Sequence, residues 1–236
     1  MLTDSYLHKG KRKKLVTLLQ EKGIKDTAVL DAVQVIPRHI FVESALHHEA
    51  YEDKALPIAE GQTISQPYTV AFMTEALQLS KGMKILEIGT GSGYQAAVLC
   101  AMGLRVFSVE RNARLHAFAK SRLEKLGFDP YVQKGDGSEG WKRYAPYQRI
   151  IVTAAAPSIP RSLQNQLDIG GKMIIPVGGR EQQTMTIVTR LSTSDFQVQR
   201  LNQFRFVPLI GRYGWEGKEG KEGKESSKEN EGLAGD

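Results

Sequence analysis

Apolar and polar positions alternate with two different periods between residues 83 and 206, and this pattern predicts strands and helices in succession. Short apolar runs are typical of buried strands, and apolar residues three or four apart are typical of helices. Strands are expected at 83–88, 105–109, 131–133, 149–153, 172–177, 184–191 and within 196–206, and helices at 93–101, 112–126 and 160–167. We therefore predict an α/β fold, a mostly parallel sheet with helices on both faces and an antiparallel hairpin of the last two strands at one edge.

Apolar residues at helical spacing also occur before residue 83. They predict amphipathic helices at 11–22, from Asp26 or Thr27 to Pro37, and at 69–79, whereas residues 1–10 are expected to be loose. A polar loop, Gly61–Tyr68, precedes the third of these helices. We interpret it as a lid or substrate wall, as a helix-capping turn with Ser65 as the cap, or as both.

The length of 236 residues suits one domain with extensions. Residues 1–215 are predicted to form that domain, with a helical N-terminal part and the polar loop in 1–80 and the α/β core in 81–215. From residue 216 to 236, Glu-Gly-Lys occurs three times and no apolar residue precedes Leu233. Such a segment buries too little apolar surface to fold, so we predict a disordered charged tail.

The net charge is +6, and the tail holds four Lys against seven acidic residues, which leaves +9 on residues 1–215. This excess suits nucleic acid or acidic surfaces as partners, or it serves solubility. The lack of an arginine-rich face with interleaved aromatic residues favours solubility. No apolar run could span a membrane, no signal peptide is evident, and Cys100 is the single cysteine, so we expect a cytoplasmic protein without a membrane partner.

The most informative stretch is Glu87–Gly93 (EIGTGSG), in which three alternate glycines separate a predicted strand from a predicted helix. Such a turn presents backbone N–H groups to a nucleotide-like ligand. The third glycine comes one residue too early for the dinucleotide fingerprint. Glu87 would repel a pyrophosphate but attract the amino group of S-adenosylmethionine (SAM), and Glu110, at the end of the next strand, is placed for ribose hydroxyls. We favour a SAM site over a purely structural glycine turn.

Several motifs together resemble the protein-L-isoaspartate O-methyltransferases, and the resemblance covers residues 1–215. They are Gly61–Tyr68 (GQTISQPY), Glu87–Gly93, Lys134–Gly137 (KGDG), Val152–Pro157 (VTAAAP), Val207-Pro208-Leu209, Pro37–Val42 and Tyr51–Ile58. The resemblance implies a Rossmann-like SAM-dependent methyltransferase fold with extra N-terminal helices and a rearranged C-terminal edge. It also implies methyl transfer from SAM to the free α-carboxylate of L-isoaspartyl residues in damaged proteins and peptides, with S-adenosylhomocysteine as product. The ester would collapse to a succinimide, which starts repair.

The resemblance assigns the catalytic role to Ser65. We interpret that role as orientation of the substrate carboxylate together with Thr63, because a carboxylate is already ionised and nucleophilic at neutral pH. The expected substrate-binding residues are Thr63, Ile64, Ser65, Gln66, Val207, Pro208 and Leu209. The expected cofactor-binding residues are Gln62, Thr63, Glu87, Gly89, Thr90, Gly91, Ser92, Gly93, Glu110, Arg111, Asp136 and Gly137. An edge strand with a proline stop explains 207–209 equally well, and 135–137 also suits a simple turn.

Two other functions stay open. A different SAM methyltransferase could act on a small molecule or on RNA, which the basic residues 9–14 would support, although 153–157 lacks the N/D-P-P-Y/F pattern of amine methylation. A SAM-fold binding module without activity is the second, and the intact Glu87, Glu110 and Ser65 argue against it. The five histidines show no metal-ligand spacing, so no metal is expected. We expect a monomer that does not bind nucleic acid.

Overall fold

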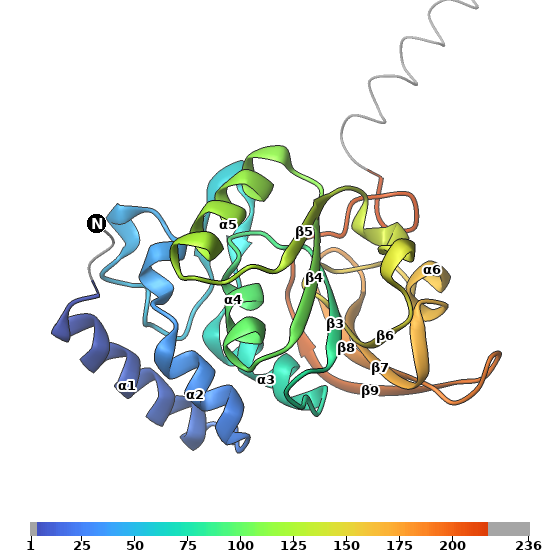
Figure 1. Ribbon diagram of the computed structural model, residues 1–236, viewed down its shortest axis with the longest axis horizontal. Helices are drawn as coiled ribbons and strands as arrows, with labels where there is room; N and C mark the ends of the chain where they lie inside the picture. The colour runs from blue at the N-terminus through green and yellow to red at the C-terminus, as the bar shows by residue number, and fades with distance from the viewer. Residues whose placement is uncertain (1–3, 217–236) are drawn as a thin grey trace, which may run out of the picture.

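The computed structural model describes residues 4–216, and the predicted disordered tail, apart from Glu216, lies outside this range. Its centre is a sheet of seven strands in the order β5-β4-β3-β6-β7-β8-β9 (Figure 1). The strands are β3 (Lys84–Ile88), β4 (Arg105–Glu110), β5 (Tyr131–Lys134), β6 (Tyr147–Val152), β7 (Leu167–Gly178), β8 (Gln183–Arg190) and β9 (Phe196–Phe204). The first five in this order are mutually parallel, and β8 is antiparallel to both β7 and β9. The predicted fold class and antiparallel edge are confirmed.

The strand order reverses between β3 and β6, which are parallel neighbours. From β3 the chain proceeds to β4 and β5 on one side, whereas β6 and β7 lie on the other. In open α/β sheets, ligands bind in the crevice beyond the carboxyl ends of the strands at this switch point. The glycine turn directly follows β3, so the topology places it at this crevice.

Alternate strand residues build two hydrophobic clusters, one on each face of the sheet. Ile85 and Val106 belong to the cluster that α3 (Pro67–Ala76) and α4 (Tyr94–Ala101) share, with α5 (Ala113–Lys125) also on it. The second cluster is covered by short helices and aromatic rings, namely α6 (Arg161–Gln164), the 3-10 helices η4 (Gly137–Glu139) and η5 (Lys142–Tyr144), and partly buried Trp141. Helices therefore cover both faces, but unequally.

The predicted helix at 160–167 is shorter than expected, because α6 ends at Gln164 and β7 already begins at Leu167. Leu167 pairs with Tyr147 of β6, and the pairing shifts register before it resumes at Arg149 and Lys172. Gly170 adopts a φ of +77° within this irregular segment. The pairing with β6 thus makes the glycine pair at 170–171 part of β7, whereas we expected these glycines only to end the helix.

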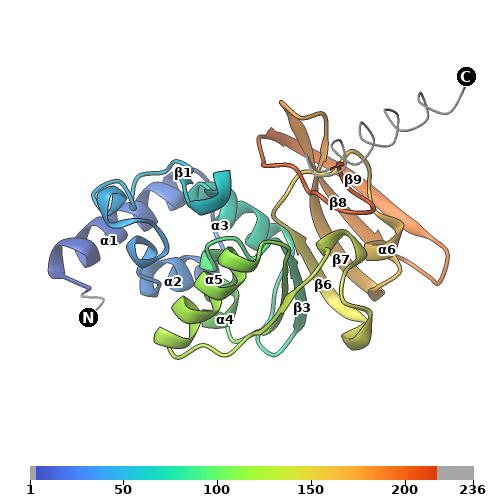
Figure 2. The same cartoon turned by 90° about the horizontal axis from the view of Figure 1, so that it is seen from above.

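The N-terminal segment packs α1 (Tyr6–Glu21) and α2 (Thr27–Val35) beside α3, at the end of the molecule opposite β8 and β9 (Figure 2). The expectation that residues 1–10 are loose is wrong for the described part, since α1 begins at Tyr6. The side chain of Ser5 caps the helix by accepting a hydrogen bond from the backbone N–H of His8 (3.2 Å). Arg12, although basic, is buried and paired with Asp4, which anchors the first turns.

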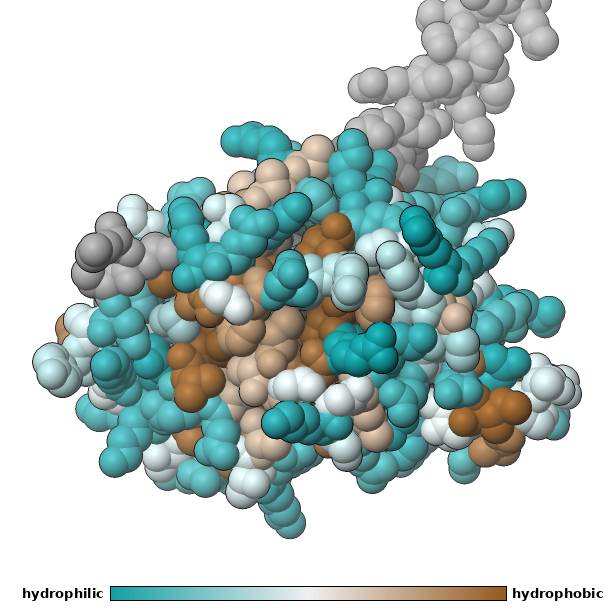
Figure 3. Space-filling model, viewed as in Figure 1, coloured by the Kyte–Doolittle hydropathy of each residue, from teal (hydrophilic) through white to brown (hydrophobic). Residues whose placement is uncertain are grey.

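The remaining elements are short. The 3-10 helices η1 (Arg38–Phe41) and η2 (Ser44–Leu46) follow α2, and a two-stranded sheet of β1 (Leu56–Pro57) and β2 (Thr63–Ile64) encloses η3 (Ala59–Gly61). Polar and charged residues cover most of the face in Figure 3, and apolar side chains gather near its middle. Among residues 4–216, none of the helices has the length and apolar character needed to cross a bilayer.

Candidate functional site

A cavity of about 480 Å³ lies at the carboxyl ends of β3, β4 and β6, between the glycine turn and the polar loop. The structure brings together at this cavity most of the residues predicted from the sequence: Gln62, Thr63, Ile64, Ser65, Gly89, Thr90, Gly91, Ser92, Glu110, Arg111, Gly137, Val207, Pro208 and Leu209. Sequence reasoning did not identify Val70, Ile88, Tyr94, Gln95, Val109, Asn112, Ala113, Leu115, Thr153, Ala154 and Ile210, which also line it. Most of these are apolar or internal to an element, so their types carry no signal of a site.

The glycine turn forms the floor of this cavity with bare backbone. Gly89 has a φ of +93°, and a Cβ added there would lie 2.6 Å from the Oγ1 atom of Thr153. That hydroxyl donates to the carbonyl of Gly89 (2.6 Å), so strand β6 holds the turn directly. Gly93 does not line the cavity; it is the left-handed cap of α4 and packs against Ala119 of α5. Only glycine combines these backbone angles with such close approach.

Glu110 closes one side of the cavity and is almost fully buried. One carboxylate oxygen accepts from the backbone N–H of Gly91 (2.8 Å), and the other accepts from that of Asn112 (2.8 Å). A carboxylate oxygen has lone pairs for more than one donor. Glu110 therefore links the glycine turn to the start of α5 and can still accept from a diol in the cavity.

Glu87 lies elsewhere than expected. It is fully buried on β3, outside the cavity lining, where the Ser108 hydroxyl donates to one of its oxygens and the other oxygen has no partner within residues 4–216. Burial raises the pKa of Glu87 to about 8, the hydrogen bond from Ser108 lowers it, and the charge of Glu110 raises it further. The carboxyl group is thus mostly protonated at neutral pH. In this state Glu87 presents no negative charge to an amino group, contrary to the expectation from the sequence.

Asp136 also lies outside the cavity lining, although its neighbour Gly137 is part of it. One oxygen of Asp136 accepts from the backbone N–H and the hydroxyl of Ser138 (2.8 and 2.7 Å), and the other accepts from the backbone N–H of Arg212 (2.7 Å). The carboxylate therefore fastens the segment after Leu209 to η4. A Cβ on Gly137 would lie 2.5 Å from Ile88, so glycine keeps this wall close to the cavity.

The opposite wall carries two hydroxyl groups, those of Thr63 and Ser65. Neither forms a hydrogen bond to another residue in the described part of the chain, and both residues line the cavity. The interpretation of Ser65 as a helix cap is wrong, because the N-cap position of α3 is Gln66, which makes no side-chain capping bond, and Pro67 follows it. The two hydroxyls are therefore available to a ligand.

Arg38 holds this wall in place, and sequence reasoning did not single it out. Its guanidinium is fully buried and donates to the backbone carbonyls of Ala50 (2.8 Å), Lys54 (3.0 Å) and Ser65 (3.1 Å). Burial lowers the pKa of Arg38 to about 10, so the side chain stays charged at neutral pH. The sequence signal of this role was limited to an arginine two residues before the apolar run Ile40-Phe41-Val42.

Two acidic residues complete the support of the wall. Asp53 accepts from the side-chain amide of Gln66 (3.0 Å) and the backbone N–H of Tyr68 (2.8 Å). Glu60, in the left-handed region with a φ of 61°, accepts from the Asn112 side chain (3.0 Å) and from Arg114 (2.8 Å). This second contact ties the residue just before the polar loop to the start of α5.

The segment Val207–Leu209 follows β9 and crosses the end of β6. The carbonyl of Val207 accepts from Ala155 (2.8 Å), and the N–H of Leu209 donates to Ala155 (2.7 Å). The carbonyl of Leu209 accepts from Trp215 (2.7 Å). The N–H of Val207 and the carbonyl of Pro208 form no such bond within residues 4–216, so they are the backbone groups that this segment can offer to a ligand.

A second cleft, of about 750 Å³, adjoins the cavity on the far side of Ser65. The two spaces share Thr63, Ser65, Thr153, Val207 and Pro208, whereas Gln66 lines the cleft but not the cavity. The hydroxyls of the polar loop therefore stand where the cavity and the cleft meet.

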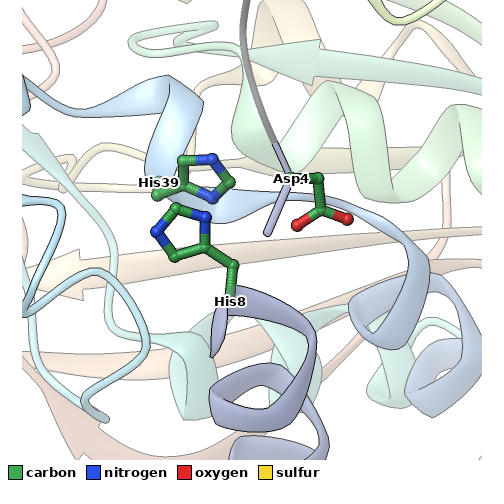
Figure 4. A group of neighbouring side chains, drawn as sticks. All are labelled: Asp4, His8 and His39. Atoms are coloured by element: carbon green, nitrogen blue, oxygen red, sulfur yellow. The ribbon is translucent and has the colours of Figure 1, made fainter. Parts of the chain in front are cut away.

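The structure also brings together Asp4, His8 and His39, whose spacing in the sequence did not predict a metal site (Figure 4). Their potential metal-ligand atoms lie within 4.8 Å of one another. Both oxygens of Asp4 already accept from the guanidinium of Arg12 (3.0 and 2.9 Å), and Nδ1 of His39 lies 2.7 Å from the hydroxyl of Tyr51. A dication there would face the charge of Arg12, so we interpret the group as a hydrogen-bonding network that anchors α1. The absence of a bound metal stays a prediction.

Comparisons with known proteins match this geometry. The family model of protein-L-isoaspartate(D-aspartate) O-methyltransferases matches residues 10–214. The protein-L-isoaspartate O-methyltransferase of Cytophaga hutchinsonii is 50% identical over 91% of this chain and 97% of its own length. That of Christiangramia forsetii is 53% identical over 89% of this chain and 98% of its own.

Solved structures show the same fold. A protein-L-isoaspartate O-methyltransferase, 31% identical, superposes with a TM-score of 0.79 over 86% of this chain and 67% of that chain. A Plasmodium falciparum structure in complex with S-adenosylhomocysteine, 24% identical, gives a TM-score of 0.74 over 84% of this chain and 98% of that chain. At that identity the second match speaks for the fold alone.

Proposed function

Because the chain belongs to the protein-L-isoaspartate(D-aspartate) O-methyltransferase family, we propose that its cavity and adjoining cleft divide the work of methyl transfer between them. The enzyme transfers a methyl group from SAM to the free α-carboxylate of L-isoaspartyl residues in damaged proteins and peptides. The cavity would hold the cofactor, and the cleft would hold the peptide. The observation that carries this assignment is the position of the Thr63 and Ser65 hydroxyls where the two spaces meet.

The residues of the cavity fit a nucleoside with a charged amino acid arm. Glu110 offers acceptors for the ribose hydroxyls, and the close backbone at Gly89 and Gly137 leaves room that a Cβ would fill. Bound there, SAM supplies an electrophilic methyl group on a positively charged sulfur. Gln62, Thr90, Ser92 and Arg111 line the same space and complete the proposed cofactor site.

Ser65 and Thr63 would orient the substrate carboxylate by donating their hydroxyl protons to it. No general base is needed, because the carboxylate is ionised at neutral pH. Alignment of the attacking oxygen with the acceptor carbon is the main task, and such positioning contributes several kcal/mol, roughly 7–11 at best. Ser65 therefore acts through orientation and not as a nucleophile.

The reaction consumes an anion and a cation and yields neutral products, so water slows it by stabilising the separated charges. A site that replaces water with a few fixed dipoles favours the transition state. Val207 and Pro208 line the same space. The N–H of Val207 and the carbonyl of Pro208, which have no backbone partner within residues 4–216, would bind the main chain of the isoaspartyl residue. Ile64 and Leu209 supply apolar walls that exclude water.

The proposal is tested with SAM carrying a labelled methyl group and two synthetic peptides that differ only in isoaspartate against normal aspartate. We expect label on the isoaspartyl peptide alone, released as methanol by mild base, which identifies a carboxyl ester. Label on neither peptide, with S-adenosylhomocysteine binding intact, would contradict the proposed function, and RNA would then be the next substrate to test. Sedimentation of the same preparation tests the expected monomer.

A further inference from the structure

The cleft beside Ser65 must receive the residues that flank the isoaspartate, if the proposed function holds. It shares Ser65, Val207 and Pro208 with the cofactor cavity, so a carboxylate held at Ser65 has the rest of its peptide directed into this space. Successive residues of an extended peptide advance by about 3.3–3.6 Å. Side chains one to three residues from the isoaspartate therefore lie within reach of the cleft walls.

The charged side chains that line this cleft are both arginines. Arg180 lies on the turn between β7 and β8, and Arg205 follows the end of β9. Both are exposed, and no aspartate or glutamate is among the lining residues. The nearby carboxylate of Asp53 is buried behind Gln66 and bonded to it. A ligand in the cleft thus meets two positive charges and no exposed negative one.

The donors of both arginines are unused in the described part of the chain. Within residues 4–216, neither guanidinium forms an ion pair or a hydrogen bond. Arg180 instead lies over the ring of Trp215, 4.9 Å from its centroid. Stacking of this kind holds a guanidinium in place without occupying its N–H groups. The guanidinium of Arg180 is therefore held in place, and its N–H groups can donate to both oxygens of a carboxylate in the bidentate mode that arginine favours.

The remaining walls suit a peptide. Tyr68, Phe204 and Phe206 contribute aromatic surface, and Asn202 and Gln203 contribute uncharged polar groups. Phe204 is fixed by ring contacts with Phe72 and Phe206, so this surface is supported from behind. Apolar contact would retain any peptide, whereas the two arginines distinguish peptides by charge.

We propose that Arg180 and Arg205 form a carboxylate-binding subsite that selects isoaspartyl peptides with aspartate or glutamate close to the damaged residue. The inference rests on the proposed function, because it assigns the flanking peptide to this cleft. It adds a sequence preference that the reaction itself does not require.

The experiment uses the full chain and three isoaspartyl peptides that are identical except for glutamate, glutamine or lysine two residues from the isoaspartate, placed on either side in turn. We expect kcat/KM for the glutamate peptide to exceed that for the glutamine peptide by about fivefold on one side, as one or two partly exposed ion pairs allow. The lysine peptide should be poorer than both. The preference should shrink as salt is raised.

The Arg180→Gln/Arg205→Gln double variant should bring the glutamate-to-glutamine ratio close to one. Arg105→Gln is the matched control, because Arg105 is exposed at the opposite end of β4 and lines neither space; it changes the overall charge and should leave the ratio unchanged. Equal rates for the three peptides with the unmodified enzyme, or a ratio that survives in the double variant, would overturn the inference. Failure to methylate any isoaspartyl peptide would instead overturn the proposed function.

Discussion

The two walls of the site are built in different ways. The cofactor wall is the turn after β3, whose position follows from the sheet and from glycines at alternate positions of one short segment. The substrate wall is the polar loop, which has little regular structure. It is held by Arg38 and Asp53 from earlier in the chain and, through Glu60 just before it, by the start of α5. Local backbone geometry therefore shapes one wall, whereas long-range contacts of charged groups shape the other. Substitutions in the two walls should therefore affect cofactor binding and methyl transfer differently.

Gly89→Ala should damage the cofactor wall most. The new Cβ would sit at a left-handed φ and close to the Thr153 hydroxyl, so the turn must shift. We expect methyl transfer to fall on the order of 100-fold, because displacement of about 1 Å in a reacting site has that effect, and S-adenosylhomocysteine binding by calorimetry should weaken with it. Gly127→Ala is the control, since Gly127 is also left-handed but has open space around it. If both variants behaved alike, close approach at Gly89 would not be the cause.

Arg38→Gln should damage the substrate wall and spare the cofactor wall. Three backbone carbonyls would lose a charged donor, which we expect to lower the free energy of unfolding by about 3 kcal/mol and the transfer rate by about tenfold. Cofactor affinity should change little. Arg149→Gln removes another arginine that donates to backbone carbonyls, those of Leu77 and Gln78, away from the site. Arg149→Gln should lower the free energy of unfolding without lowering the transfer rate per folded molecule. An equal loss of rate in both variants would show that Arg38 acts only through the stability of the fold.

Glu87 links the cofactor wall to pH. Its pKa is raised to about 8 in the folded protein, above the ordinary value near 4.5, so the folded state retains a proton that the unfolded state has lost. This contribution lowers stability as pH rises from about 4.5 to 8. Glu87→Gln cannot ionise, so its melting temperature relative to the unmodified protein should rise steadily over that range. A constant difference between pH 5 and pH 8 would refute the raised pKa.

Glu60→Gln should have the smallest effect. It weakens an exposed contact with Arg114 that ties the two walls together, and such pairs contribute about 0.2–1 kcal/mol. We expect dissociation of S-adenosylhomocysteine, followed by stopped flow, to become about two- to threefold faster. Glu124→Gln, which removes a pairing with Lys120 along α5, is the control and should not change it. No change in the Glu60 variant would show that the loop does not gate release.

The contrast between the walls also explains how far the sequence could predict the site. The alternation of strands and helices and the spacing of Gly89, Gly91 and Glu110 are local signals. The structure confirms the alternation and places all three residues at the cavity. Glu87 and Asp136 are acidic residues at motif positions where cofactor binding was expected, yet burial and hydrogen bonds keep them out of the cavity lining. Arg38 could not be identified as the support of Ser65, because its three acceptors are backbone carbonyls up to 27 residues away, and a carbonyl has no residue type to read.

The sharpest test of the separation between the walls is Ser65→Ala, with two quantities measured on one preparation. Loss of the hydroxyl should lower kcat for an isoaspartyl peptide by about 100-fold, as removal of one oriented donor does elsewhere. The dissociation constant for S-adenosylhomocysteine should stay within about twofold of its original value. If cofactor affinity fell in step with the rate, Ser65 would belong to the cofactor wall, and the division of labour between cavity and cleft would be wrong.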